Sequence, residues 1–484
     1  MRFIILGGGL SGLSCGAALA MNGHGVVLIE KEGEVGGLAR SHRMDGCVFD
    51  YGPHLLFGPQ VLPLLKGDLA PDLDLIPIRR DMERIYFRKR YFKFPFEPKN
   101  LVLNMERKRI PGAVFGLLTG SILRKVDHSS VNNVEDWVVR VVGRSLYDYT
   151  SLGGYIQKLY GIPPKEVAED WGIQKLKFLG RLQSANLLQL GLKTLDEEKK
   201  LGAQVVNYPP GGIDRLASHI ANKVTDLGGT IRLRSEAFVV KKKSNGVVLH
   251  FREDGREETI EGDFLVSTVP VSRLMRIIYP APPENIANAT DLLKYRTLLL
   301  VFLCIAKERV LDYQCIYFTE KDVPFRRITE FKNLDHRMAP EGKSSLCVEM
   351  TCFEGDTISM RDQHTVFTYV VGELEKQGFV KEKDIESHAV IKIPYAYPLY
   401  DIGYNRVLDQ VLDYLGSVNR VVSIGRQGLF HYNTMSNSIL EGYQVGKALS
   451  AAQREGFEGI IQRVYRERTD KYNNMSSLGT EVAA

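Results

Sequence analysis

The chain has 484 residues, is 44% hydrophobic and 25% charged, and carries a formal net charge of +5 at pH 7, which predicts a large globular protein of two to three domains. Because the 63 basic and 58 acidic residues nearly balance and are dispersed, a nucleic acid is not an expected partner. The six cysteines form no C-x-x-C pair and no run of about 18 uncharged apolar residues occurs, so we expect free thiols in a reducing cytoplasm, no metal site and no transmembrane helix.

The first residues, MRFIILGGGLSG, have two interpretations, a secretory leader or the first strand and turn of a nucleotide-binding domain. A leader needs an apolar run of about 7–15 residues, whereas the run from Phe3 to Leu6 stops at three glycines, so we do not expect a leader. The second interpretation makes residues 2–6 a buried parallel strand and residues 10–20 a helix, with G-x-G-x-x-G between them.

Each glycine of this turn has a predicted task. Gly7 permits the tight turn, Gly9 lets the backbone approach a pyrophosphate, and Gly12 lets the helix pack close to the strand. Leu10 and Ser11 begin the helix, whose unpaired N–H groups face the phosphates. The alternative is a Gly-rich turn with a purely structural role.

A second strand follows at residues 26–29, and Glu30 comes 18 residues after Gly12, near the offset of about 20 expected for a carboxylate that binds a ribose. We place Lys31 in the same predicted cofactor site. An ordinary surface glutamate is the alternative for Glu30.

Two further turns, G-G-L-A-R-S at residues 36–41 and F-D-Y-G-P-H at residues 49–54, show a resemblance to the FAD-dependent amine oxidase and protoporphyrinogen oxidase superfamily. The resemblance implies an FAD cofactor that the first of these turns wraps, through Gly37, Leu38 and Arg40. Arg40 would lie by the flavin ribityl and phosphate, with a surface arginine as the alternative.

The alternation of strands and helices that is typical of an α/β fold occurs at two further places along the chain. Residues 205–240 hold P-P-G-G-I-D, a helix over 216–227, G-G and a strand, and the strand 264–269 follows. In the superfamily this piece belongs to the FAD domain, where the backbone near Ala237 would bind the adenine edge.

The second of these places holds a predicted strand over 421–424 and a predicted helix from about Ser436 to Ala452. The stretch GRQGLFHYNTMSNSILEGYQVGKAL closely resembles the closing FAD motif of UDP-galactopyranose mutases and protoporphyrinogen oxidase-like proteins. It implies FAD contacts from Gly425, Arg426, Asn433, Met435 and Ser436. Ser436 stands where many relatives have an acidic residue, so no acid/base role is assigned to it. The helix N-terminus can stabilise negative charge on the reduced flavin.

The predicted fold class is therefore α/β, a Rossmann-like (GR2-type) FAD-binding domain with an inserted α+β substrate domain. The FAD-binding domain takes residues 1–75, 205–270 and 410–455. The substrate domain takes 76–204, which is mainly helical, and 271–405, whose strand-rich runs predict an antiparallel sheet. Residues 456–484 form a C-terminal helix and tail.

Four side chains are candidates for the reaction site. His54 follows Gly52 and Pro53 in a turn expected below the isoalloxazine ring, where an imidazole could hydrogen-bond N5 or shuttle its proton near neutral pH. Arg327, Tyr397 and Tyr400 match positions that bind the sugar diphosphate in the mutases, and an arginine fork suits phosphate oxygens. The alternatives are a structural histidine and tyrosines packed on a sheet.

Three functions remain open. The preferred one is an FAD-dependent oxidoreductase that takes a hydride from its substrate onto flavin N5. A mutase of the UDP-galactopyranose type would use reduced flavin as a nucleophile without net redox change, and a minor alternative is a non-catalytic escort for prenylated proteins. A nucleotide sugar, an amine or a polycyclic or polyene compound would be the small-molecule substrate. No second dinucleotide motif follows a strand, so a separate NAD(P)H domain is not expected.

A peripheral membrane contact is an alternative for the apolar stretch 110–118, which Lys108, Arg109, Arg124 and Lys125 flank. A buried helix lining the substrate domain is the preferred interpretation.

Overall fold

Five short strands from three distant parts of the chain form one parallel sheet. The computed structural model describes residues 1–96, 98–116, 131–175, 205–452 and 456–473. Within them the sheet has the order β20-β13-β1-β2-β9 and every pair in it is parallel. Its strands are β1 (Arg2–Leu6), β2 (Gly25–Ile29), β9 (Thr230–Arg232), β13 (Phe264–Ser267) and β20 (Val421–Ser423).

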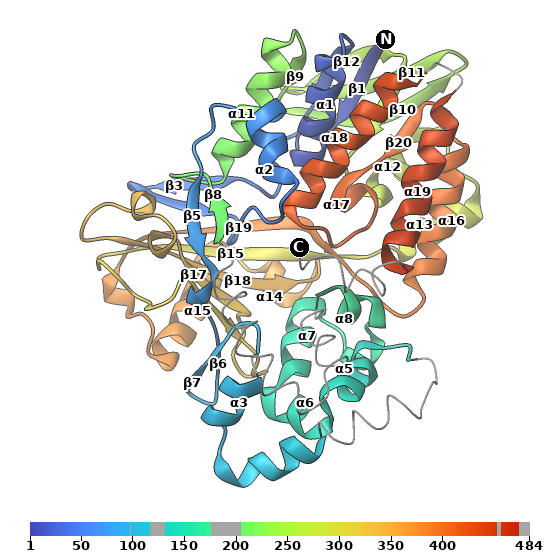
Figure 1. Ribbon diagram of the computed structural model, residues 1–484. Helices are drawn as coiled ribbons and strands as arrows, with labels where there is room; N and C mark the ends of the chain where they lie inside the picture. Colours follow the sequence, from blue (N-terminus) through green and yellow to red (C-terminus); the bar gives the residue numbers. More distant parts are fainter. Residues whose placement is uncertain (97, 117–130, 176–204, 453–455, 474–484) are drawn as a thin grey trace.

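Two helices pack against each other beside this sheet (Figure 1). Helix α1 (Leu10–Met21) is buried from Leu10 to Ala20, and α18 (Met435–Ala451) lies along it. The approach is close, because a methyl group added at Gly442 would lie 2.2 Å from the carbonyl oxygen of Ser11. Helix α11 (Asp214–Asp226) also contacts α1. The nucleotide-binding turn therefore lies where segments from both ends of the chain converge.

A second, smaller sheet extends this upper part of the molecule. Its order is β12-β11-β10-β14, from β10 (Ser235–Lys243), β11 (Gly246–Glu253), β12 (Arg256–Gly262) and β14 (Ile278–Tyr279). The stretch that follows the predicted FAD segment thus forms α12 (Val271–Ile277), β14 and α13 (Glu284–Leu292) next to it, before the chain enters the lower part.

The lower part is built on a seven-stranded sheet of order β19-β15-β18-β17-β16-β6-β7. Alternate residues of its long strand β15 (Tyr295–Ile305) face opposite ways. Leu299, Val301 and Leu303 pack with α15 (Gln363–Gln377), whereas Leu300 and Phe302 belong to the main core. The other strands are β19 (Ile385–Pro398), β18 (Ser344–Cys352), β17 (Arg327–Glu330), β16 (Cys315–Phe318), β6 (Glu83–Phe87) and β7 (Arg90–Lys93).

Two antiparallel strand pairs join the two parts. Strands β3 (Ser41–Met44) and β4 (Cys47–Asp50) pair with each other, and Phe49 stacks on Phe302 with ring centroids 5.0 Å apart. Strand β5 (Ile76–Arg79) pairs with β8 (Val205–Tyr208), although about 130 residues separate them in sequence. The core is continuous from the parallel sheet to the inner face of the large sheet.

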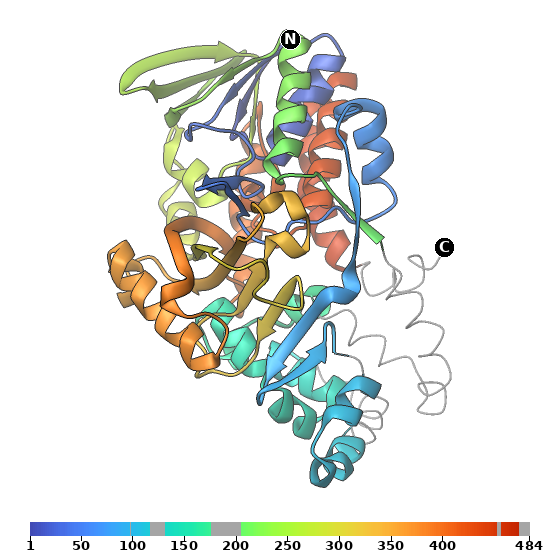
Figure 2. The ribbon, with the colours of Figure 1, turned by 90° about the vertical axis from the view of Figure 1, so that its left-hand side faces the viewer.

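Helices cover the far end of the lower part (Figures 1 and 2). Among the described residues, no helix is long and apolar enough to cross a bilayer. The helices are α3 (Pro98–Asn104), α5 (Val134–Val142), α6 (Arg144–Thr150), α7 (Leu152–Tyr160) and α8 (Glu169–Lys175), and α16 (Tyr404–Ser417) and α19 (Phe457–Asn473) lie in the upper part.

The structure confirms the predicted fold class and each predicted strand and helix of the parallel sheet and its neighbours. The four strand-rich runs of residues 297–393 belong to one sheet and pair antiparallel with their neighbours from this part of the chain, as expected, but the sheet is mixed because β16 also pairs in parallel with β6. The division into domains stays a prediction, and its parts at 117–130, 176–204, 453–455 and 474–484 lie outside the described residues.

We expect Gly442→Ala to destabilise the protein by about 1–3 kcal/mol, because its methyl group must displace the backbone of α1. Thermal unfolding of the FAD-loaded protein measures the effect. The matched control is Gly372→Ala in α15, where an added methyl group meets no atom within 4 Å and alanine favours the helix by about 1 kcal/mol. Equal melting temperatures for the two variants would contradict close packing of α1 on α18.

Candidate FAD and substrate site

The three glycines of the first turn occupy three different environments. Gly7 has φ +105°, a conformation that side chains rarely adopt. A methyl group at Gly12 would lie 2.2 Å from the Gly7 carbonyl oxygen, whereas one at Gly9 would meet no atom within 4 Å. The turn, the close packing and the open approach thus fall on the glycines predicted for them. Leu10 and Ser11 are buried in the first turn of α1.

Glu30 is buried at the end of β2, with an exposed fraction of 8%. Its carboxylate accepts hydrogen bonds from the backbone N–H groups of Gly8, at 2.6 Å, and Glu32, at 2.9 Å. The Glu30 carbonyl accepts from Ser235 N, which places the start of β10 beside it. Glu30 is therefore held beside the glycine turn and is not an ordinary surface glutamate.

Ala237 and Lys31 are the two other predicted cofactor residues near Glu30. Ala237 is buried in β10, at a bulge opposite β11. Lys31 is exposed and pairs with Glu32 at 3.3 Å.

The second glycine-rich turn lies directly against the first. Gly36 N donates to the Gly8 carbonyl at 2.8 Å, and a methyl group at Gly37 would lie 3.2 Å from Gly9 Cα. Arg40 donates to the Gly37 carbonyl and lies over the Tyr51 ring, 5.0 Å from its centroid. Its side chain is only 13% exposed, so the alternative of a surface arginine does not fit. Leu38 is half-buried between these turns.

The closing segment, which begins at Gly425, also contacts the start of α1. Gly425 has φ +80°, and a methyl group on it would lie 2.8 Å from Ser11 Oγ. Glu441 of α18 accepts from Gly425 N at 2.7 Å and from Asn433 Nδ2 at 3.3 Å. Met435 begins α18, and Ser436 Oγ accepts from Phe57 N at 2.9 Å.

These residues fit FAD. Gly9 leaves the room at a helix N-terminus that a pyrophosphate needs, and the buried Glu30 carboxylate is an acceptor for ribose hydroxyls. The start of α18 lies next to the loop that follows Gly52, Pro53 and His54, where its N–H groups can stabilise negative charge.

A row of polar side chains crosses the large sheet on the side that faces this loop. Tyr317 of β16 lies opposite Arg327 of β17, and Arg327 lies opposite Glu349 of β18. Arg327 donates to both carboxylate oxygens of Glu349, at 2.5 and 2.8 Å, and its third nitrogen lies 3.4 Å from the Tyr317 hydroxyl. Because side chains alternate along a strand, this register puts all three on one face.

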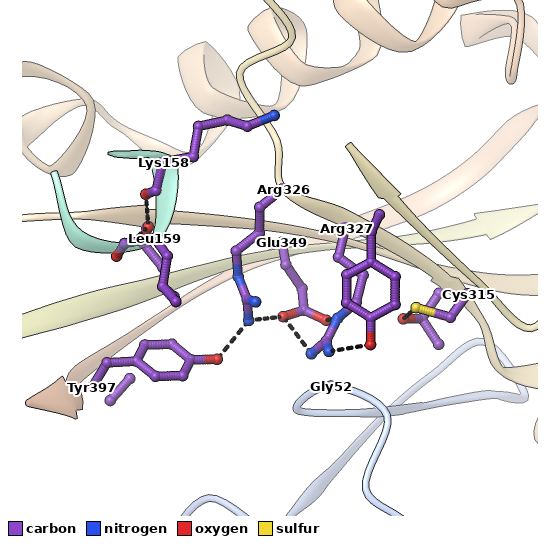
Figure 3. A network of polar contacts seen from close by, with 12 residues as sticks. Gly52, Lys158, Leu159, Cys315, Arg326, Arg327, Glu349 and Tyr397 are labelled. Atoms are coloured by element: carbon purple, nitrogen blue, oxygen red, sulfur yellow. Dashed lines mark hydrogen bonds and ion pairs between the residues drawn. The ribbon is translucent and has the colours of Figure 1, made fainter. Parts of the chain in front are cut away.

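Arg326 completes a buried network (Figure 3). It donates to Glu349 at 2.7 Å and to the Tyr397 hydroxyl at 2.5 Å. Glu349 is fully buried, which alone would raise the pKa of its carboxyl, yet the two guanidiniums hold that pKa below its usual range. Glu349 is therefore ionised and paired, and it is not available as a general base.

Arg426 adds a third guanidinium. It lies close to the rings of Tyr397 and Tyr432, 5.1 and 4.4 Å from their centroids, and donates to the backbone carbonyls of Ala396 and Asn433. Burial raises the pKa of the Tyr397 hydroxyl to about 12, so this group stays protonated. The three guanidiniums outnumber the two carboxylates of this wall, Glu349 and the Glu83 that accepts from the Tyr317 hydroxyl at 3.1 Å, so its net charge is positive.

His54 lies in the loop that contacts the arginine network through Gly52. Its Nδ1 is 2.9 Å from the Gly52 carbonyl, which can only accept, so Nδ1 carries the proton and Nε2 is left as an acceptor. Burial, and then the charge of Arg327, lower its pKa to about 4. The expected proton shuttle near neutral pH does not fit this value, because the ring is already neutral there. A methyl group at Gly52 would lie 3.2 Å from Arg327 Nη2, so the loop and the polar row are in contact.

Tyr400 lies apart from this network. It is fully buried, stacks on Tyr404 with centroids 4.3 Å apart, and its hydroxyl accepts from Tyr432 N at 2.8 Å. These contacts agree with the packing alternative that the sequence left open.

The sequence reasoning missed Arg326, Glu349 and Tyr317. Glu349 could have indicated this network, because it is a lone carboxylate inside the apolar run SSLCVEMTC and a buried charge requires a partner. It also missed Lys158, which donates to the carbonyls of Glu320, Val323 and Phe325 and so fixes the loop before Arg326. Burial lowers the pKa of Lys158 to about 7. The described residues include no cluster of three or more candidate metal ligands.

Comparison with known proteins places these features in context. The model of a family described as flavin containing amine oxidoreductase matches residues 10–455. The chain is 21% identical to 4,4'-diaponeurosporene oxygenase of Staphylococcus aureus (strain USA300), over 80% of this chain and 83% of the relative. It is 24% identical to 4,4'-diapophytoene desaturase (4,4'-diapolycopene-forming) of Methylomonas sp, over 72% of each chain.

Among solved structures, the fold is similar to that of a reduced UDP-galactopyranose mutase. The TM-score is 0.76 at 20% sequence identity, and the match covers 96% of this chain and 98% of the mutase. The family match confirms the resemblance found in the sequence and FAD as the cofactor, whereas the individual residue roles stay predictions.

We expect Glu30→Gln to weaken FAD binding by about tenfold, because a charged acceptor for the ribose hydroxyls becomes a neutral one. Ultrafiltration of the yellow protein, followed by flavin absorbance of the filtrate, measures the loss. Glu236→Gln, on an exposed carboxylate of the same part of the molecule, is the control and should retain FAD. Equal retention in both variants would remove Glu30 from the cofactor site.

The lowered pKa of His54 predicts a pH dependence of stability. The unfolded chain takes up a proton near pH 6.5 and the folded protein only near pH 4, so the contribution of neutral His54 is present above pH 6.5 and is lost as pH falls through 4. Melting temperatures should therefore fall more steeply in this interval for the parent protein than for His54→Gln. His336→Gln, at a ring with 85% exposure, should keep the parent slope. Parallel curves for parent and His54→Gln would show that His54 is not desolvated.

Proposed function

Because the chain belongs to the family of flavin containing amine oxidoreductases, we propose that it is an FAD-dependent oxidoreductase whose small-molecule substrate carries an anionic group. Bound FAD supplies an acceptor for a hydride from a substrate carbon, at flavin N5. The protein binds and orients the substrate and supplies the electrostatic environment.

The observation that carries the proposal is the wall made by Arg326, Arg327 and Arg426 around Tyr397. Its central carboxylate, Glu349, pairs with two of the three guanidiniums, and a second carboxylate, Glu83, accepts from the hydroxyl of Tyr317. Net positive charge beside the flavin favours its reduced, more negative state. The same charge attracts a carboxylate or phosphate of the substrate, and the arginine forks suit such groups.

The chain's own ionisable groups leave little room for acid/base catalysis. Glu349 is ionised and bonded, His54 is neutral, and Tyr397 is protonated. His54 Nε2 remains a hydrogen-bond acceptor that can orient a substrate or cofactor N–H. Chemistry by the cofactor therefore agrees better with this site than hydrolysis or proton abstraction by a side chain.

Redox chemistry is favoured over isomerisation because the names of the two curated relatives denote a desaturase and an oxygenase. The second candidate is a mutase that acts on a nucleotide sugar. It is supported by Arg327 and Tyr397, the two positions that match diphosphate-binding residues of the mutases and that belong to one network here. A cytoplasmic location stays a prediction.

The deciding experiment exposes the two oxidation states of the enzyme to different compounds under anaerobic conditions. Oxidised enzyme receives carboxylated porphyrinogens, amines and polyenes, and enzyme reduced by dithionite receives UDP-hexoses. We expect bleaching of the flavin by an anionic substrate, with electrons recovered on an added acceptor. Ring contraction of a UDP-hexose without flavin oxidation would instead establish the mutase.

Charge-matched variants test the role of the arginine wall. Arg327→Gln removes one cation and should slow reduction by the anionic substrate at least about tenfold, since one buried charge pair is worth roughly 1.5 kcal/mol or more. Arg327→Gln combined with Glu349→Gln restores the net charge and should recover part of the rate. Equal loss in both variants would show that geometry, and not charge, governs substrate binding.

A further inference from the structure

Three large apolar side chains are exposed at the far end of the lower part. Leu103 is 74% exposed, Phe115 is 68% exposed and Val114 is 41% exposed. Leu103 belongs to α3, and the other two lie on a helical stretch at residues 110–116. Figure 2 shows α3 and the following helix at the end of the molecule opposite the N-terminus. None of these side chains has a role in the site described above. The exposure of Val114 and Phe115 contradicts the preferred expectation of a buried helix over 110–118, of which 117 and 118 lie outside the described residues.

The small residues of the helical stretch 110–116 show which of its sides faces the rest of the protein. A methyl group at Gly112 would lie 3.1 Å from Ser145 Oγ, and one at Gly116 would lie 3.6 Å from Gly143 Cα, so this side lies against the start of α6. Ala113 is buried. Because a helix turns by about 100° per residue, Val114 and Phe115 are carried to the outer side.

Six basic residues surround these side chains, at the tip of the β6–β7 hairpin (88–90) and in the turn 107–109. The two groups are joined. Arg90 donates to the Asn104 carbonyl at 2.9 Å, and Arg88 and Arg109 both pair with Glu106, at 3.8 and 2.9 Å. Glu106 is the one acidic residue within 88–90 and 103–115, so the surface has strong net positive charge although the whole chain has little.

We propose that this surface, residues 88–90, 103, 107–109 and 114–115, docks the protein on the anionic lipid surface of a membrane. Cations attract anionic headgroups, and apolar side chains among them insert between the headgroups. Stable peripheral binding needs two such signals together, and both are present here. A nucleic acid would be held by the cations alone and would gain nothing from exposed Leu103 and Val114, which favours the lipid.

Vesicle co-sedimentation of the FAD-loaded protein tests this docking surface. The probes are vesicles of phosphatidylcholine alone and vesicles that also contain phosphatidylglycerol. We expect binding to the anionic vesicles that weakens as salt is raised, and little binding to the neutral ones. Leu103→Gln/Phe115→Gln and Arg107→Gln/Lys108→Gln should each lower the partition coefficient by about tenfold.

Met360→Gln is the matched control, since Met360 is 75% exposed but lies in α14 (Thr357–Met360), away from this surface, and it should bind as the parent does. Flavin absorbance and melting temperature establish that each variant is folded. Absence of binding to anionic vesicles would overturn the proposal, as would equal binding of parent and both double variants. Tight, variant-sensitive binding of an oligonucleotide without vesicle binding would also overturn it, in favour of a nucleic-acid surface.

Discussion

The close approach of backbone to backbone around helix α1 is the constraint on which the molecule depends. The helix begins at the glycine turn, and Gly12, Gly425 and Gly442 bring β1 and the closing segment with α18 so near that a single methyl group on any of them would meet another atom within 2.8 Å. Because protein interiors are close-packed, an added methyl group at these positions would force neighbouring atoms to move and would lower the stability of the fold. Two segments that are far apart in the sequence, the N-terminal turn and the closing segment with α18, therefore meet at one helix N-terminus, where the FAD site is predicted.

The second half of the site depends on electrostatics. Glu349 on the large sheet holds Arg326 and Arg327 by charge-assisted hydrogen bonds, and the loop at Gly52 lies against Arg327. Burying these groups costs much solvation energy. Removal of one partner leaves an uncompensated buried charge. Such a network therefore contributes more to fixing a single arrangement of the side chains than to the stability of the fold. It ties the large sheet to the same loop that α18 holds through Ser436.

The sequence predicted what is local and missed what is brought together by tertiary structure. The turn at Gly7 to Gly12, Glu30 and the start of α18 follow from motifs in which each residue has its own backbone or charge requirement, and the structure has these elements where they were expected. Strand β6, in contrast, pairs with β16 more than 200 residues later, and its hairpin turns through Arg88 and Lys89 at positive φ without the usual Asn-Gly signal. Arg326 and Glu349 become partners only once that sheet has formed its register.

The same hairpin connects the basic surface with the candidate substrate site. Its tip carries residues 88–90, and the chain just after it carries Phe94, which stacks on Tyr317 with ring centroids 4.2 Å apart and an interplanar angle of 11°. Tyr317 lies in the polar row beside Arg327. Because sheet pairing and ring stacking hold this path together, a partner that orders the hairpin tip also restrains Tyr317. The proposed docking surface and the proposed substrate site at the arginine wall are therefore joined by one connected set of residues, although they lie at different places in the fold.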